Sequence, residues 1–435
     1  MMKIEGVKMK AEEKFVRSFK GETPVPLPTL KQSEMEEQRQ PSSSETSTFQ
    51  VNNTIETLLK FTLTLSIEES LDIGLSKEFC SSLLKEDEYD HTYPSSTSTT
   101  DISEGVPAYP LYKHLASALC RSISLGAIHT PNANIPLIHD DSSMNQKMIE
   151  WNKIILEKGS DLIQMLETVE FGLHVQEPFF TQIKDGKKTI EGRCASGDYN
   201  RIESGSLILL NKCLMLQVHD VHYYGSFYDM LATEDLTKVL PGVESIKEGV
   251  QIYRRFYSEE KERSNGVLAI FLTKPTSQLY DHMAVILKAL HYDGVQRLLR
   301  MSHTVGTIPD ALPLPKSTLL SAFSSPHNPN VKSSILSDGA RALAKHVNRS
   351  NGKFWGSFAG NESHKNMLAV NAINHLVAHC CWMNVHTIPP HGAVFEIRVY
   401  DGYGARWALN PPKVSHNTFT IINITIKIHG LRDFI

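Results

Sequence analysis

The chain has 435 residues, 41% of them hydrophobic, and its formal net charge is −4. This length suits about three domains with real cores, and the near-neutral charge excludes a global positive field, so any nucleic-acid site has to be a local patch. Six cysteines without a CxxC spacing favour a reducing compartment over a disulfide framework.

The N-terminus carries charges where a signal peptide needs an apolar core, and no run of about eighteen apolar residues occurs. We therefore expect a nuclear or cytoplasmic protein that makes no membrane contact. Residues 1–53 are rich in proline, serine and charge, which predicts a disordered N-terminal tail.

Residues 54–168 carry apolar side chains at helical spacing and predict a helical module with a Ser/Thr-rich linker. Ser66 and Glu69 have the spacing of a capping box, which predicts that a second, short helix begins there. Further helices are expected over Pro110–Arg121 and from Asp141. The apolar stripes favour core packing, and the alternative is a surface for protein partners.

A dense group of ionisable residues follows in the stretch IKDGKKTIEGRC, residues 183–194. Pro178 can begin a short helix that Gly186 ends, and TIEGRC then alternates like a strand. The bend and one face of the strand gather four polar side chains that can bind a phosphate, a base edge or an amide. They are Lys188, Thr189, Glu191 and Arg193.

The pattern GxKxxExR, residues 186–193, lies in this helix-to-strand context and resembles the ASCH domain, a family with a PUA-like β-barrel. The strands LMLQVHDVHYYG and GVLAIFLTKP, separated by a helical insert, follow in the order of that family. The resemblance implies an ASCH (PUA-like) domain over residues 169–276 that binds RNA, in RNA metabolism or transcription coactivation. Lys188 and Arg193 would then hold phosphate, and Glu191 would accept a hydrogen bond from a base amine.

The same resemblance leaves a second function open, because small ASCH amidohydrolases act on an acetylated nucleoside, N4-acetylcytidine. Their chemistry is attributed to a lysine and a threonine of the motif and to a glutamate elsewhere. Lys188 and Thr189 are present here, Glu191 is the motif's own carboxylate, and a lysine whose pKa falls on burial can act as a base. The further glutamate is open among four residues: Glu203, Glu259, Glu260 and Glu262. A third interpretation is structural, with Glu191 and Arg193 only holding the barrel closed.

Residues 277–435 predict an α+β C-terminal domain, which makes the whole chain an α+β multidomain protein. An amphipathic helix with a break at Gly294 comes first. In the next helical stretch Arg341, Lys345 and Arg349 are four apart beside aromatic residues, which suits a nucleic-acid backbone. A solvated basic surface is the alternative.

The stretch 361–386 predicts one long helix in which His375 and His379 are four apart. Two histidines at this spacing can bind zinc, but the glutamate of HExxH is absent and apolar residues surround both rings. We therefore expect neither a metal site nor a cofactor.

A strand follows, AVFEIRVY, with Phe395, Ile397 and Val399 predicted inward and their neighbours, Glu396, Arg398 and Tyr400, outward. Beyond it, DGYGARW concentrates recognition chemistry for a phosphate or a stacked base. Together with Arg398, the proposed contacts are Tyr403 and Arg406. The alternative is a hairpin corner with Trp407 packed inside.

Overall fold

A computed structural model describes residues 44–87, 105–128, 142–331, 334–347, 354–389, 392–409 and 420–425. A disordered tail was predicted for residues 1–53, and residues 1–43 of it lie outside the described part of the chain. From Ser44 onward the chain is helical, in α2 (Ser44–Ile67), so the prediction of disorder is wrong for residues 44–53. The described helices include none that is long and apolar enough to cross a membrane.

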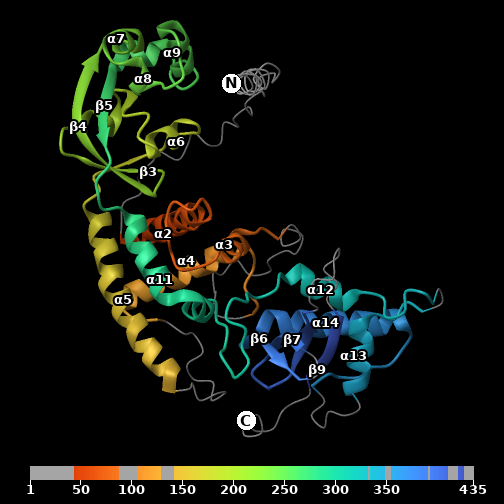
Figure 1. Cartoon of the computed structure of the whole chain (residues 1–435). Coiled ribbons are helices and arrows are strands. Elements are labelled where there is room, and N and C mark those ends of the chain that lie inside the picture. The colour runs from red at the N-terminus through yellow and green to blue at the C-terminus, as the bar shows by residue number, and fades with distance from the viewer. Residues whose placement is uncertain are drawn as a thin grey trace, which may run out of the picture. The chain divides into compact units, whose positions relative to one another are not determined.

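Five helices share one apolar core (Figure 1). They are α2, α3 (Lys77–Leu84), α4 (Leu111–Leu125), α5 (Ser142–Glu167) and α11 (Leu279–Leu298). The apolar stripe predicted from Thr54 is buried in this core, because Ile55, Leu58 and Leu63 are all 0% exposed. Inside α11 the chain breaks at His291, whose φ is 51°, close to the break predicted at Gly294.

The capping box predicted at Ser66 is wrong. Ser66 is buried inside α2, with its hydroxyl beside the thiol of Cys80. The next helix, α3, begins instead after Ser76, whose Oγ accepts a hydrogen bond from the Phe79 backbone N–H at 3.2 Å. The apolar stripe of α2 therefore carries the helix past a sequence signal that could have started a new one.

The middle of the chain forms a mixed α/β unit around a curled, five-stranded half-barrel sheet with the order β1-β3-β4-β5-β2. Its strands are β1 (Phe171–Leu173), β2 (Ile190–Cys194), β3 (Leu207–Leu210), β4 (Leu214–Tyr224) and β5 (Val267–Thr273). Only β1 and β3 pair in parallel, and a register shift between Val218 and Asp220 bends β4. Both strands that the sequence predicted after the motif, β4 and β5, are confirmed.

The insert between β4 and β5 contains α7 (Phe227–Thr233), α8 (Leu236–Val239), α9 (Ile246–Tyr253) and α10 (Glu259–Asn265). Each begins at a residue whose side-chain oxygen accepts a backbone N–H of the first turn, which explains where these short helices start. The four caps are Ser226, Asp235, Ser245 and Ser258. The insert packs on one end of the sheet around Phe227 and Tyr253.

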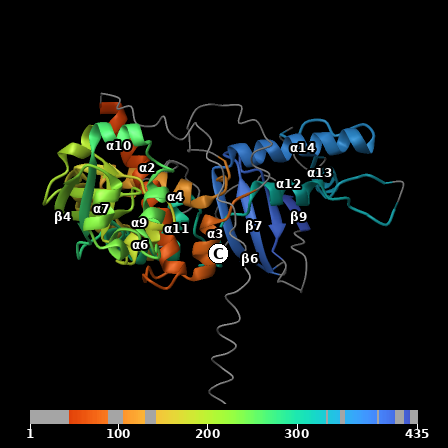
Figure 2. The same ribbon diagram turned by 90° about the horizontal axis from the view of Figure 1, so that it is seen from above.

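The C-terminal part is a four-stranded antiparallel sheet in the order β6-β7-β8-β9. Its strands are β6 (Trp382–Ile388), β7 (Gly392–Arg398), β8 (Gly404–Ala408) and β9 (Thr420–Thr425). Three helices pack together against this sheet in both views (Figures 1 and 2). They are α12 (Lys316–Ser324), α13 (Asp338–Val347) and α14 (Glu362–His379). Phe395, Ile397 and Trp407 fill the shared core and are 0% exposed.

Two predictions fail in this region. The helix predicted to reach His386 ends at His379, because Cys380 is extended and the seven residues from Trp382 to Ile388 form β6. Pairing of β6 with the whole of β7 outweighs the local helical pattern. Glu396, predicted to face outward, is 0% exposed. The side chains of β7 do alternate between its two faces as predicted, but Glu396, on the polar face, is buried as well.

Candidate functional site

The ASCH-like motif lies on a helix, a bend and a strand, as its sequence pattern predicts. Helix α6 (Phe179–Lys184) leads to Gly186, whose φ of +72° is a left-handed conformation that glycine adopts without strain. The backbone N–H groups of Lys187 and Lys188 both donate to the carbonyl of Gln182, which closes the bend. Strand β2 begins two residues later, at Ile190.

Lys188 lies inside this bend, with its side chain only 1% exposed. Its Nζ lies 3.1 Å from Oε2 of Glu191, donates to the carbonyl of Ile190 at 2.8 Å and also donates to the carbonyl of Val239. These contacts use all three donors of an ammonium group. Burial lowers the pKa of Lys188, against the attraction of Glu191. Lys188 therefore tethers β2 to the end of α8.

Glu191 lies between two cations. Arg193 donates from Nε to Oε1 of Glu191 at 2.9 Å and from Nη2 to the carbonyl of His174 at 2.7 Å. Burial acts to raise the pKa of Glu191, but the charges of Lys188 and Arg193 outweigh it and lower the pKa. Arg193 keeps 14% of its side chain exposed and lies over the ring of Tyr199. The motif is thus a buried ion triad that reaches the surface at Arg193.

The other candidates of the hydrolase interpretation lie as follows. Thr189 is half-buried, and its backbone N–H donates to the carbonyl of Lys238. Glu262 accepts a hydrogen bond from the Phe227 backbone N–H at 2.6 Å and pairs with Arg254, so it anchors the start of α7. The remaining three glutamates, Glu203, Glu259 and Glu260, are exposed. The roles of Lys188, Thr189 and Glu191 in catalysis stay a prediction.

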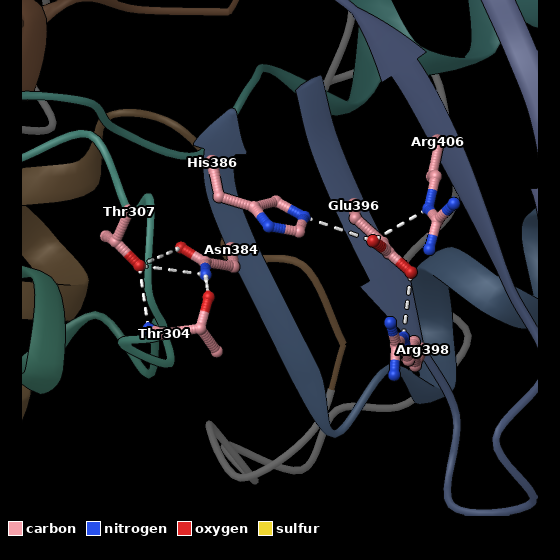
Figure 3. A network of polar contacts seen from close by, with 7 residues as sticks. All are labelled: Thr304, Thr307, Asn384, His386, Glu396, Arg398 and Arg406. Atoms are coloured by element: carbon pink, nitrogen blue, oxygen red, sulfur yellow. Dashed lines mark hydrogen bonds and ion pairs between the residues drawn. The ribbon is translucent and has the colours of Figure 1, made fainter. Parts of the chain in front are cut away.

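A second set of charged residues meets on the polar face of the C-terminal sheet. The strand register sets Glu396 on β7 opposite Asn384 on β6 and opposite Arg406 on β8. His386 follows Asn384 by two residues, so both lie on the same face of β6, and Arg398 follows Glu396 in the same way on β7. Adjacent antiparallel strands thereby collect His386, Glu396, Arg398 and Arg406 around one carboxylate (Figure 3).

The carboxylate of Glu396 contacts all three neighbours. Nε2 of His386 lies 3.1 Å from Oε2, Nε of Arg398 lies 2.8 Å from Oε1, and Nε of Arg406 lies 2.8 Å from Oε2. Burial acts to raise the pKa of Glu396, but the His386 hydrogen bond and the two arginines outweigh it and lower the pKa to about 2. We call these four residues the Glu396 cluster.

The cluster has an excess of positive charge, because one carboxylate faces two guanidinium groups and a histidine. Arg398 also stacks on Trp382, with Cζ 4.6 Å from the ring centre. Within the described part of the chain, the Nη groups of Arg398 and Arg406 have no hydrogen-bond partner. Both side chains stay partly exposed, at 14% and 19%. Two guanidinium groups whose Nη donors are available in this way suit the binding of a phosphate.

Beside His386 lies a neutral polar group. Asn384, 0% exposed, donates from Nδ2 to the hydroxyls of Thr304 at 2.9 Å and Thr307 at 3.0 Å. Figure 3 shows these three residues on one side of His386 and the arginines on the other. Nothing in the local sequence pattern marked this group.

The remaining predicted nucleic-acid contacts are separate from the cluster or buried. Arg341 and Lys345 are exposed on α13, and Arg349 lies outside the described residues. Tyr403 is 4% exposed and stacks on Phe354 with ring centres 4.0 Å apart. Trp407 is in the core, as the hairpin-corner alternative expects. Of the contacts predicted in this region, the structure brings together Arg398 and Arg406. The sequence pattern had marked Glu396 as an outward residue of its strand and had not assigned His386 to a nucleic-acid site.

Comparisons with known proteins match two stretches of the chain. The family model of the ASCH domain matches residues 173–276, and the model of the CdiA C-terminal tRNase toxin domain matches residues 326–412. Three members of the Glu396 cluster lie on β7 and β8, and all four fall within the second stretch. The search among curated proteins found no match.

Two solved structures resemble the first stretch in sequence. The hypothetical protein PH0355 is 40% identical, over 24% of this chain and 98% of its own, with a TM-score of 0.24. Protein PF0455 from Pyrococcus furiosus is 43% identical, over 25% of this chain and 100% of its own, with a TM-score of 0.23. Nearly the whole of each relative therefore corresponds to about a quarter of this chain.

Proposed function

Because the chain belongs to the ASCH family through residues 173–276, we propose that it acts on RNA, binding it through the ASCH domain and cleaving it at the Glu396 cluster. The observation that carries the cleavage is a buried, ionised carboxylate in contact with one histidine and two arginines, inside the stretch similar to a tRNase toxin domain.

The proposed RNA contact of the ASCH domain is the bend between α6 and β2. Lys187 is exposed there, with 68% of its side chain accessible, and its ion partner Asp185 is 3.7 Å away. Arg193 is the second cation of the proposed contact, with 14% of its side chain exposed. Lys188 and Glu191 then act indirectly, by fixing the shape of the bend. Exposed cations on a rigid bend hold a phosphate backbone without selecting its sequence.

The proposed cleavage uses the RNA's own 2′-hydroxyl as the nucleophile. With Nε2–H of His386 donating to Glu396, Nδ1 carries the lone pair of the neutral ring and accepts the 2′-hydroxyl proton. The 2′ oxygen forms a bond to the adjacent phosphorus while the bond to the 5′ oxygen breaks. The 5′ oxygen takes a proton from water, and the hydroxide that remains takes the proton held by His386. The products are a 2′,3′-cyclic phosphate and a 5′-hydroxyl.

Each member of the Glu396 cluster has a role in this step. Glu396 holds the imidazole and stabilises the imidazolium that forms, since its pKa of about 2 keeps it ionised. The Nη groups of Arg398 and Arg406 stabilise the charge that develops on the phosphate oxygens. A side chain at pKa 2 is itself a weak base, so the proton carrier in this proposal is His386.

The test uses the full chain with transfer RNA, with a short single-stranded RNA and with DNA of the same sequence. We expect RNA fragments that end in 2′,3′-cyclic phosphate and 5′-hydroxyl groups, and no cleavage of DNA, which lacks the nucleophile. Cleavage of both nucleic acids, or ends with a 5′-phosphate, would contradict the mechanism. Binding is measured separately as RNA retention at two salt concentrations. No retention at either salt concentration would contradict RNA binding by the ASCH domain.

A further inference from the structure

A short segment lies along the open edge of β6, next to His386. Three backbone hydrogen bonds attach it: Ser302 N–H to the Met383 carbonyl at 2.8 Å, Ile308 N–H to Val385 at 2.9 Å, and Thr387 N–H to Gly306 at 2.9 Å. We call residues 302–308 the edge segment. Near its C-terminal end Thr307 pairs with His386 across the edge, so the segment and the proposed proton carrier are direct neighbours.

The edge segment contains a tight turn, Thr304–Thr307. The Thr307 N–H donates to the carbonyl of Thr304 at 3.0 Å, and the Thr304 N–H donates to the Thr307 hydroxyl at 2.8 Å. Gly306 has a φ of +87°, which only glycine adopts without strain. At the tip, Val305 is 99% exposed. The turn therefore presents an apolar side chain to solvent from a fixed backbone.

Two buried amides hold this turn and the residues that directly follow it. Asn384 holds the hydroxyls of Thr304 and Thr307, and Gln296 donates to the carbonyls of Ile308 at 3.0 Å and Ala311 at 2.7 Å. Both amides are 0% exposed. Buried amides in this position keep a loop in one conformation, because leaving them unpaired is costly. A rigid wall of this kind can discriminate between ligands, whereas a mobile one cannot.

The charge on the two sides of His386 differs. In Figure 3 the side of His386 toward the turn carries the hydroxyls of Thr304 and Thr307 and the amide of Asn384, all neutral, while the opposite side carries Arg398 and Arg406. A nucleotide is divided in the same way, into an anionic phosphate and a neutral nucleoside. A phosphate held by the arginines, with its ribose at His386, directs one adjoining nucleoside toward the turn.

We propose that the Thr304–Thr307 turn is the wall against which a nucleoside next to the cleaved phosphate packs, and that it sets which nucleotide is cleaved. Asn384 is a positioning residue for this wall. The inference rests on the proposed cleavage function and adds its substrate selectivity. In this proposal the side chain of Val305 contacts the base, and the rigid backbone of the turn sets the shape of the surface that the nucleoside packs against.

The experiment measures kcat/KM of the full chain on dinucleoside monophosphates that differ only in one base. We expect the unaltered chain to prefer some bases, and Val305→Lys to change the ratio between the best and worst bases by about tenfold, as one altered contact does. The position is fully exposed, so the substitution does not disturb folding. Val331→Lys is the matched control, at a second exposed valine outside the turn, and it leaves the ratio unchanged.

A second variant, Asn384→Ala, loosens the wall and should weaken the base preference while keeping the pH profile of cleavage. If Asn384→Ala fails to fold, the base preference of Val305→Lys still tests the inference. Equal effects of Val305→Lys on every base, or no base preference in the unaltered chain, would overturn this inference and leave the cleavage function standing. No cleavage of any substrate by the unaltered chain would overturn both.

Discussion

Nε2 of His386 lies 3.1 Å from a carboxylate oxygen of Glu396, a residue with no exposed surface. The pair joins neighbouring strands, and two arginines bind the same carboxylate. A buried anion with more cations than it needs for neutrality is expensive to assemble, and such arrangements concentrate at functional sites.

His386→Gln should abolish RNA cleavage while the chain stays folded. The amide keeps a donor for Glu396 but cannot take up a proton, so we expect kcat to fall by about a thousandfold, as for the loss of a general base. The measurement is single-turnover cleavage, with circular dichroism as the check on folding. His375→Gln, at an exposed histidine of α14, is the control and should cleave normally. Unchanged cleavage by His386→Gln would remove this residue from the mechanism.

Glu396→Gln should destabilise the C-terminal sheet. Removing the carboxylate leaves two arginines facing each other at a buried position, which costs about 3 kcal/mol of unfolding free energy. Urea unfolding followed by tryptophan fluorescence reports it, since Trp382 and Trp407 lie in this sheet. A variant as stable as the unaltered chain would show that the cluster contributes nothing to folding.

The same residue makes stability depend on acid pH. The pKa of Glu396 falls from an ordinary 4.5 to about 2 on folding. Its stabilisation is therefore complete above pH 4.5 and is lost as pH falls from 4.5 toward 2, about 3 kcal/mol in all. Urea midpoints measured across this pH range should fall more steeply for the unaltered chain than for Glu396→Gln. Parallel curves would contradict the pKa direction.

Lys188→Met should lower the stability of the ASCH domain by about 3 kcal/mol, because Glu191 loses one of its two buried partners. Thermal unfolding measures this, with Lys153→Met, at an exposed lysine of α5, as the control. The same two proteins test the hydrolase alternative when they are incubated with N4-acetylcytidine. Turnover by the control but not by a folded Lys188→Met protein would make the ASCH domain an amidohydrolase.

Lys187→Gln should weaken RNA binding without changing stability, since the side chain is exposed. Losing one phosphate contact lowers the slope of log affinity against log salt by about one unit. Titrations at several salt concentrations measure that slope, and Lys153→Gln is again the control. An unchanged slope would show that Lys187, and with it the bend between α6 and β2, does not contact the RNA.

The parts of this structure that the sequence predicted depend on local patterns. Gly186 marks the end of α6, and apolar runs mark β4 and β5. The Glu396 cluster depends instead on which strands pair. His386 sits in a stretch with a helical pattern, and only its ladder with β7 makes it a strand. The contact between Asn384 and Thr304 spans 80 residues, so no local window could show it.

The edge segment has a further consequence, for solubility. An uncovered edge strand offers unpaired N–H and C=O groups to another chain and is a common starting point for aggregation. Residues 302–308 occupy those groups on β6 through three hydrogen bonds. A substitution that releases the segment, such as Asn384→Ala, therefore exposes a template for strand addition, and its first visible effect would be self-association as protein concentration rises.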